Sequence, residues 1–218
     1  MKEKFPIIYL DNHLLIADKP AGMLTQETEK EKHSLENAAK AFLKEKFQKK
    51  GNVFLGVVHR LDKDVSGLVV FARTSKALSR LNQIFRSRQL QKVYLAVIEG
   101  TLPKRSGYLE DLLGKESHKA RITKDKDEMG KKAILFYEVI KEKNKKSLLR
   151  IFLKTGRYHQ IRIQFSSRGH PIVGDQKYGS RVFWPEKGIA LHHWKIEFIH
   201  PVKKEWLTVQ SKKSFHIV

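Results

Sequence analysis

The chain has 218 residues, 40% of them hydrophobic, which is enough for one substantial domain or two small ones. Its 44 lysines and arginines against 23 acidic residues give a formal net charge of +21. This charge favours a polyanionic partner, with nucleic acid ahead of an anionic membrane surface. The absence of cysteine excludes disulfides, thiolate metal sites and cysteine nucleophiles.

The N-terminal half is predicted to mix short strands with two helices. Residues 7–23, IIYLDNHLLIADKPAGM, suggest two strands and a Pro-Gly turn at residues 20–22. Ser34 can cap a helix that runs to about Lys49, with an apolar stripe that ends at Phe47. Strands are expected at residues 53–58 and 68–72. A second helix follows, capped by Thr74 or Ser75.

The C-terminal half is predicted to be richer in strands. Residues 92–100, KVYLAVIEG, form a strand, and residues 131–140 and 147–155 form two more around the charged turn KEKNKK. Residues 156–169, GRYHQIRIQFSSRG, suggest a short helix closed by Gly169. Final strands are expected at 189–201 and 205–211, whereas residues 102–130 show no clear pattern. The irregular order of elements favours an α+β fold with a mixed or antiparallel sheet.

Asp62 is the first candidate for chemistry. It lies in the turn RLDKDVSG before an apolar strand, a place where functional sites are commonly built. A plainer interpretation is a turn aspartate bonded to local backbone, which suits Asp64 better. A single carboxylate could act on a ribose carbon of RNA, and it would need a nearby cation to stay ionised.

Two further segments hold candidate partners. His159 and Arg162 are three residues apart and would share a helix face, with Arg157 just before them. The alternative is a helix whose basic face is simply solvated. On the strand at 92–100, Lys92 and Tyr94 share a face. A core tyrosine is the favoured interpretation from spacing alone, although Tyr94 could stack on a base or move a proton.

No motif indicates a metal or a nucleotide cofactor. The chain lacks a phosphate-binding GxxxxGK[ST] loop, a GxSxG elbow and an HExxH helix. His192 and His193 are adjacent, and neighbours on a strand point to opposite faces, so they cannot jointly hold one metal in the usual way. These patterns therefore disfavour a metal site.

Long ordered motifs resemble the RluA family of pseudouridine synthases. The chain has HRLDKDVSG for the family's HRLDxxTSG, KVYLAVIEG for its KxYxAxVxG-like strand, and TGRYHQIRIQFSSRGHPIVGDQKYG for its TGRxHQIRxHxxxxGxPIxGDxxYG. The segments LLIADKPAGM and ALHHWKIEFIHP resemble its KPAG and ALHA…F.HP segments. The likeness runs from about Ile8 to Val209. Val65 and Gln164 replace the usual threonine and histidine, and Gln26 stands where histidine is common.

The resemblance implies the pseudouridine synthase catalytic fold, with a central mixed, mainly antiparallel sheet flanked by helices and loops. It implies one catalytic domain over residues 1–218 without an S4-type RNA-binding domain, and no metal or cofactor. Asp62, Tyr94 and Arg162 would be catalytic: Asp62 at the ribose, Arg162 as its ion-pair partner, and Tyr94 stacked on the target base. The expected RNA-binding residues are Arg60, which would fill the space left by the base, with Lys92, Arg157, His159 and Gln160.

The expected activity is isomerisation of a specific uridine in structured RNA, either ribosomal or transfer RNA. One alternative is a non-catalytic RNA-binding or ribosome-assembly protein on the same scaffold. A second is a metal-dependent nuclease. The N-terminal apolar run is too short for a signal-peptide core, and no apolar stretch approaches the length of a membrane span. We therefore expect a soluble, cytoplasmic monomer without membrane contact.

Overall fold

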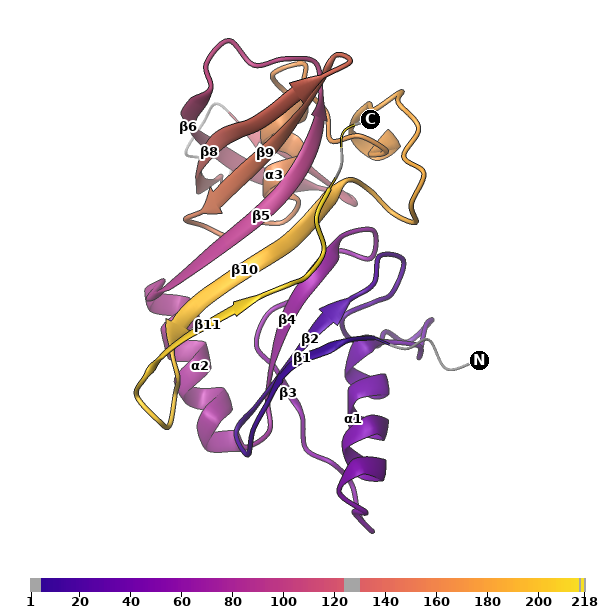
Figure 1. Cartoon of the computed structure of the whole chain (residues 1–218), viewed down its shortest axis with the longest axis vertical. Helices are drawn as coiled ribbons and strands as arrows, with labels where there is room; N and C mark the ends of the chain where they lie inside the picture. Colours follow the sequence, from indigo (N-terminus) through magenta and orange to yellow (C-terminus); the bar gives the residue numbers. More distant parts are fainter. Residues whose placement is uncertain (1–4, 124–129, 216, 218) are drawn as a thin grey trace. The chain divides into compact units, whose positions relative to one another are not determined.

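The computed structural model describes residues 5–123, 130–215 and 217, and Figure 1 labels its elements where there is room. The chain packs into two compact units. The first unit takes the residues up to Leu90 together with 195–211, and the second takes 91–194 together with 212–218. The expected single catalytic domain stays a prediction, and each unit is described on its own below.

The first unit combines antiparallel strand pairs with two helices. Its elements are β1 (Ile7–Leu10), β2 (Leu14–Lys19), α1 (Leu35–Lys46), β3 (Gly56–Val57), β4 (Ser66–Ala72), α2 (Ser75–Ser87), the later part of β10 (Leu191–Ile199) and β11 (Trp206–Gln210). β2 pairs with both β1 and β4, β3 pairs with β4, and β11 pairs with β10. In every one of these pairs the strands are antiparallel.

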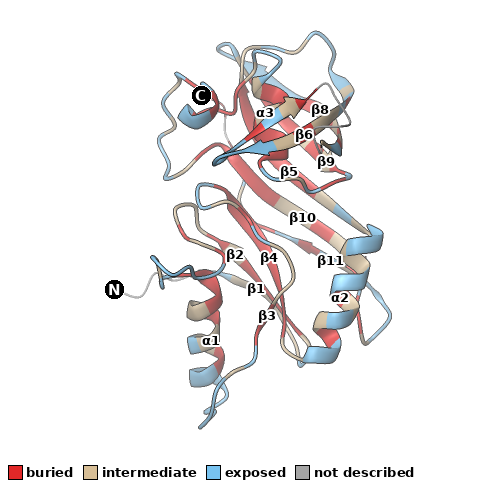
Figure 2. Cartoon of the chain, turned by 180° about the vertical axis from the view of Figure 1, so that it is seen from behind, coloured by how far each residue is buried: buried red, intermediate tan, exposed pale blue. Residues whose placement is uncertain are grey.

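The core of the first unit lies between its strands and α2. Every residue of β4 is buried, as Figure 2 shows by colour, and Leu68 and Val70 pack with Ala77 and Leu81 of α2. The outer side of α2 is exposed in the same view. Burial along its whole length fixes the position of β4. The Asp62 turn leads directly into β4, so the end of this turn is fixed as well.

Both predicted helix caps of this unit are confirmed. The Ser34 side chain accepts a hydrogen bond from the Asn37 amide at 3.3 Å, and Thr74 accepts one from the Ala77 amide at 3.1 Å. Each cap satisfies one of the first backbone N–H groups of its helix. Phe47 does not join the apolar stripe, because α1 ends before it. Its ring is 44% exposed and lies under the Arg73 guanidinium at 4.7 Å.

The second unit is built mainly from an antiparallel sheet. Its elements are β5 (Leu90–Glu99), β6 (Ser106–Glu116), β7 (Lys119–Thr123), β8 (Lys131–Lys143), β9 (Lys146–Leu153), α3 (Gln160–Ser166), the 3-10 turn η2 (Gln176–Tyr178) and the first part of β10. The strands follow the order β5-β9-β8-β6-β7, and every neighbouring pair is antiparallel. The α+β class predicted from the sequence is confirmed.

Candidate active site

The Asp62 turn connects β3 to β4 in the first unit. The carbonyl of Asp62 accepts a hydrogen bond from the Val65 amide at 3.1 Å, which closes the turn. The Asp62 residue is partly exposed, and Asp64 at the tip of the turn is exposed. Asp62 therefore sits on a short connection whose two ends are held by paired strands.

The segment after β2, which contains the Pro-Gly turn, is hydrogen-bonded to the backbone of the Asp62 turn. The Thr25 hydroxyl both donates to the Leu61 carbonyl and accepts from the Leu61 amide, each at 3.0 Å. The Gly22 amide donates to the Lys63 carbonyl at 2.7 Å, from a backbone with φ of 84° that glycine adopts at little cost. Asp62 lies between these two anchored residues, so its backbone position is fixed on both sides.

Lys19, at the end of β2, is the buried centre of this arrangement. Its side chain is 0% exposed. Its ammonium donates to the carbonyls of Met23 at 2.7 Å, Pro20 at 3.1 Å and Lys63 at 3.2 Å. Burial lowers the pKa of Lys19 to about 8, while the charges of Asp62 and Asp64 act in the opposite direction. At neutral pH the ammonium is thus mostly protonated and presents a buried positive charge to the Asp62 turn.

Replacing Lys19 with methionine should loosen the Asp62 turn. The change removes the donor of three backbone carbonyls, so we expect the free energy of unfolding to fall by about 2 kcal/mol and turnover to fall with it. Urea unfolding followed by circular dichroism measures the first effect. The matched control is Lys63→Met, which removes only an exposed ion pair with Glu31. Equal stability of the two variants would contradict the anchoring role of Lys19.

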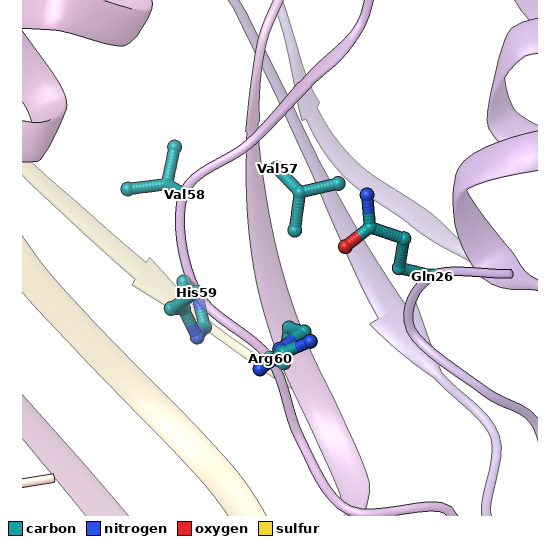
Figure 3. A pocket seen from close by; sticks show the side chains of 5 residues that line it. All are labelled: Gln26, Val57, Val58, His59 and Arg60. Atoms are coloured by element: carbon teal, nitrogen blue, oxygen red, sulfur yellow. The ribbon is translucent and has the colours of Figure 1, made fainter. Parts of the chain in front are cut away.

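Arg60 lies one residue before the anchored Leu61, at an open pocket of the first unit. The pocket has a volume of about 320 Å³ and is lined by Gln26, Val57, Val58, His59 and Arg60 (Figure 3). Arg60 is exposed, and its expected contact with RNA stays a prediction. His59 is fixed instead: its Nε2 accepts from the Val70 amide at 3.1 Å, and its ring stacks on Phe85 at 5.1 Å.

Arg162 is buried in the second unit against a carboxylate that sequence reasoning missed. Its Nε donates to Asp175 Oδ2 at 2.7 Å and a terminal nitrogen donates to Oδ1 at 2.8 Å. The two side chains are 3% and 1% exposed. The guanidinium also lies 5.0 Å from the centre of the Tyr178 ring. The alternative of a solvated basic helix face is therefore wrong for Arg162, whose plane is fixed by a two-point contact.

His159 and Gln160 hold the start of α3 together. His159 Nδ1 lies 2.7 Å from the Tyr178 hydroxyl, which itself accepts from the Ala120 amide at 2.7 Å. The Gln160 side chain accepts from Thr155 at 2.7 Å and donates to the Ile134 carbonyl at 3.1 Å. Both residues are buried, so these contacts give them structural roles. Their predicted contacts with RNA stay a prediction.

Buried neutral histidines should make the second unit sensitive to acid. Burial, with nearby cations, lowers the pKa of His159 and of His192 to about 3 each. Between about pH 6.5 and pH 3 the unfolded chain binds protons at these sites and the folded chain does not. The free energy of unfolding should therefore fall as pH falls through this window.

Urea unfolding at intervals from pH 7 to pH 4 tests this effect. We expect His159→Gln to show a shallower pH dependence than the unchanged protein, because one titrating site has been removed. A matched control is His33→Gln, since His33 is exposed. If His159→Gln and His33→Gln changed the pH dependence equally, burial of His159 would not be the cause.

Tyr94 and Lys92 lie on β5 of the second unit. The Tyr94 ring is buried and stacks on His193, with ring centres 4.6 Å apart and planes 15° from parallel. One ring face is thus occupied by His193, and the expected stacking of Tyr94 on a base stays a prediction. A Cβ at Gly156 would lie 3.2 Å from the Lys92 ammonium. The Lys92 ammonium therefore lies next to Gly156, the residue immediately before Arg157. Lys92 and Arg157 are two of the predicted RNA-binding cations.

The predicted residues are divided between the units. Asp62 and Arg60 belong to the first, and Tyr94, Lys92, Arg157, His159, Gln160 and Arg162 to the second. The ion pair between Asp62 and Arg162 accordingly stays a prediction. Within the described ranges, no group of three or more histidine, aspartate or glutamate side chains is arranged to hold a metal ion. The same ranges hold no helix that is both long and apolar enough to span a membrane.

A family model described as RNA pseudouridylate synthase matches residues 13–167. An uncharacterized RNA pseudouridine synthase of Bacillus subtilis is 33% identical over 210 residues, which cover 94% of this chain and 67% of that protein. A ribosomal large subunit pseudouridine synthase D of Nitrosomonas europaea is 35% identical over 214 residues, or 94% of this chain and 61% of that protein. The chain thus spans about two thirds or less of the length of these relatives.

Solved structures show the same fold. The human RNA pseudouridylate synthase domain containing 4 superposes with a TM-score of 0.77 at 21% identity, and covers 94% of this chain and 87% of its own. The human RNA pseudouridylate synthase domain containing 1 gives a TM-score of 0.78 at 22% identity, over 98% and 85% of the two chains. At these identities the likeness concerns the fold alone. It agrees with the catalytic fold expected from the motifs.

Proposed function

Because the chain belongs to the RNA pseudouridylate synthase family, we propose that it isomerises a uridine in structured RNA to pseudouridine. The observation that carries the proposal is the extent of the family match. It includes the anchored Asp62 turn of the first unit and both Tyr94 and Arg162 of the second. An overall charge of +21 supports an RNA substrate.

The reaction exchanges one bond for another within a single nucleotide. The bond between N1 of uracil and C1′ of the ribose breaks, the base rotates, and C5 bonds to C1′. C5 then loses its proton and N1 gains one, so the product has the same atoms as the substrate. The target base has to leave its stack to reach the site.

We assign three roles to residues of this chain. Asp62 supplies the carboxylate that acts at the ribose, as nucleophile at C1′ or as base. Arg162 supplies a fixed positive charge whose orientation is set by Asp175. Tyr94 offers the base the ring face that is not covered by His193, and its hydroxyl can assist proton transfer.

Ribosomal RNA is the first substrate class to test. Several relatives are named ribosomal large subunit pseudouridine synthase C or D, among them the proteins of Nitrosomonas europaea and Rickettsia typhi. Transfer RNA is the second class. We further propose that the protein works as a cytoplasmic monomer, which size-exclusion chromatography and cell fractionation can check.

The test is to map pseudouridine in RNA treated with the purified protein. Unmodified large-subunit ribosomal RNA and transfer RNA transcripts are incubated with the protein, and modified positions are read by chemical labelling and reverse transcription. One or a few uridines should be converted, and a chelator should not change the rate. Tight RNA binding without product would favour the non-catalytic binding protein. Strand cleavage that a chelator stops would favour the nuclease.

A further inference from the structure

The open pocket beside Arg60 has a rigid wall that the proposed reaction does not use. Val57 lies on β3 and pairs with Phe71 of β4, and Val58 packs against the core of the first unit. His59 is held by its hydrogen bond to the Val70 amide and by its stack on Phe85. The lining from Val57 to His59 is therefore formed before any ligand arrives.

Gln26 provides the polar side of this pocket. Its side chain is exposed, and in Figure 3 it extends from its loop toward Val57. A primary amide offers both a donor and an acceptor. Such a pair matches the edge of a nucleobase, which also presents donors and acceptors side by side. Arg60 adds a cation on the same pocket, suited to the phosphate that accompanies each base.

The Thr25 side chain ties the segment that carries Gln26 to the Asp62 turn. Thr25 and Leu61 are joined by the two hydrogen bonds of 3.0 Å described above. Gln26 follows Thr25 directly, and Arg60 and Asp62 flank Leu61. A ligand held by Gln26 and Arg60 would therefore lie close to the proposed catalytic carboxylate of Asp62, in a position fixed by these contacts.

We propose that this pocket binds an unpaired nucleobase of the substrate RNA close to the target uridine, and that the Gln26 amide reads its edge. This inference rests on the proposed function and adds a determinant of substrate choice to it. The volume of about 320 Å³ is at the low end of the range for small-ligand pockets and suits one nucleotide. The open shape suits a base presented by a loop, since sequence-specific recognition of RNA targets unstacked bases.

The test compares substrate preference in the unchanged protein and three variants. A hairpin RNA that carries the target uridine is randomised at the unpaired positions around it, and the modified and unmodified pools are sequenced. Gln26→Glu keeps the size of the side chain but removes its donor, and Gln26→Ala removes both polar atoms. Gln48→Glu makes the same charge change at an exposed site at the end of α1 and is the matched control.

The unchanged protein and Gln48→Glu should favour the same base at one flanking position. Gln26→Glu should change that preference, and Gln26→Ala should flatten it, with roughly a tenfold loss of kcat/KM that appears mainly in KM. An identical preference in all proteins would overturn the inference while leaving the proposed function intact. A free nucleoside monophosphate that competes with RNA equally in all proteins would also overturn it. Absence of pseudouridine from the unchanged protein would refute the proposed function itself.

Discussion

Replacing Asp62 with asparagine should abolish pseudouridine formation, with a fall in turnover of at least about four orders of magnitude. The amide has nearly the same shape as the carboxylate but cannot act as a nucleophile or base at the ribose. The fold should be unaffected, because Asp62 is partly exposed and its turn is held by hydrogen bonds from the Gly22 amide and the Thr25 hydroxyl. Single-turnover assays with labelled RNA measure the loss.

Asp64→Asn is the matched control for this change. Asp64 lies two residues further along the same turn and is exposed, so its variant loses the same charge from the same place. RNA binding should be similar in both variants, because we expect the 44 lysines and arginines of the chain to supply most of it. An Asp62→Ala protein that kept activity within tenfold of the unchanged protein would show that the central assignment is wrong.

Breaking the pair between Arg162 and Asp175 should have the second largest effect. The motif alone suggests Arg162 as a counter-cation for Asp62, whose removal would cost activity but not stability. The structure changes this expectation. With both side chains buried, removal of either partner leaves an uncompensated buried charge, which costs about 3–5 kcal/mol.

Asp175→Asn isolates the role of orientation. It keeps the Arg162 charge but removes the carboxylate that fixes the guanidinium plane, so we expect lower stability together with a large loss of turnover. Arg168→Ala is the control, because Arg168 pairs with Asp111 at 3.0 Å but is about one third exposed and should cost far less. Equal unfolding midpoints for Asp175→Asn and Arg168→Ala would contradict the buried pair as a source of stability.

Local signals explain which elements could be predicted from sequence. Ser34 and Thr74 are followed by apolar residues at helical spacing, and both helices begin where these caps indicate. The strand expected at 53–58 shrinks to Gly56 and Val57, because only these two residues find a partner in β4. β6 and β7 were missed because their many exposed polar residues hide the alternation.

For the candidate site, too, local sequence signals identify some residues and miss others. Asp62, Tyr94 and Arg162 could be proposed from the sequence because they lie in recognisable motifs. The supports around them depend on contacts between distant segments, such as Thr25 with Leu61 or Arg162 with Asp175. No periodicity within one segment reports such a contact. One sequence signal could have identified Lys19 as a support. It is a lysine at the end of an apolar strand, and a lysine buried there needs hydrogen-bond partners for its ammonium.

The division of the chain into units has a consequence for its synthesis. The core of the first unit is built from Leu14, Leu68 and Leu81 but also from Phe198 and Val209. These last two residues leave the ribosome only after the whole 91–194 segment has been made. The N-terminal residues must therefore wait, with part of their apolar surface uncovered, while the later segment can already begin to fold. Domains usually fold from the N-terminus during translation. Here the unit that carries Asp62 starts first and is completed late, so a chain whose synthesis stops before residue 196 would lack Ile196, Phe198 and Val209 of this core.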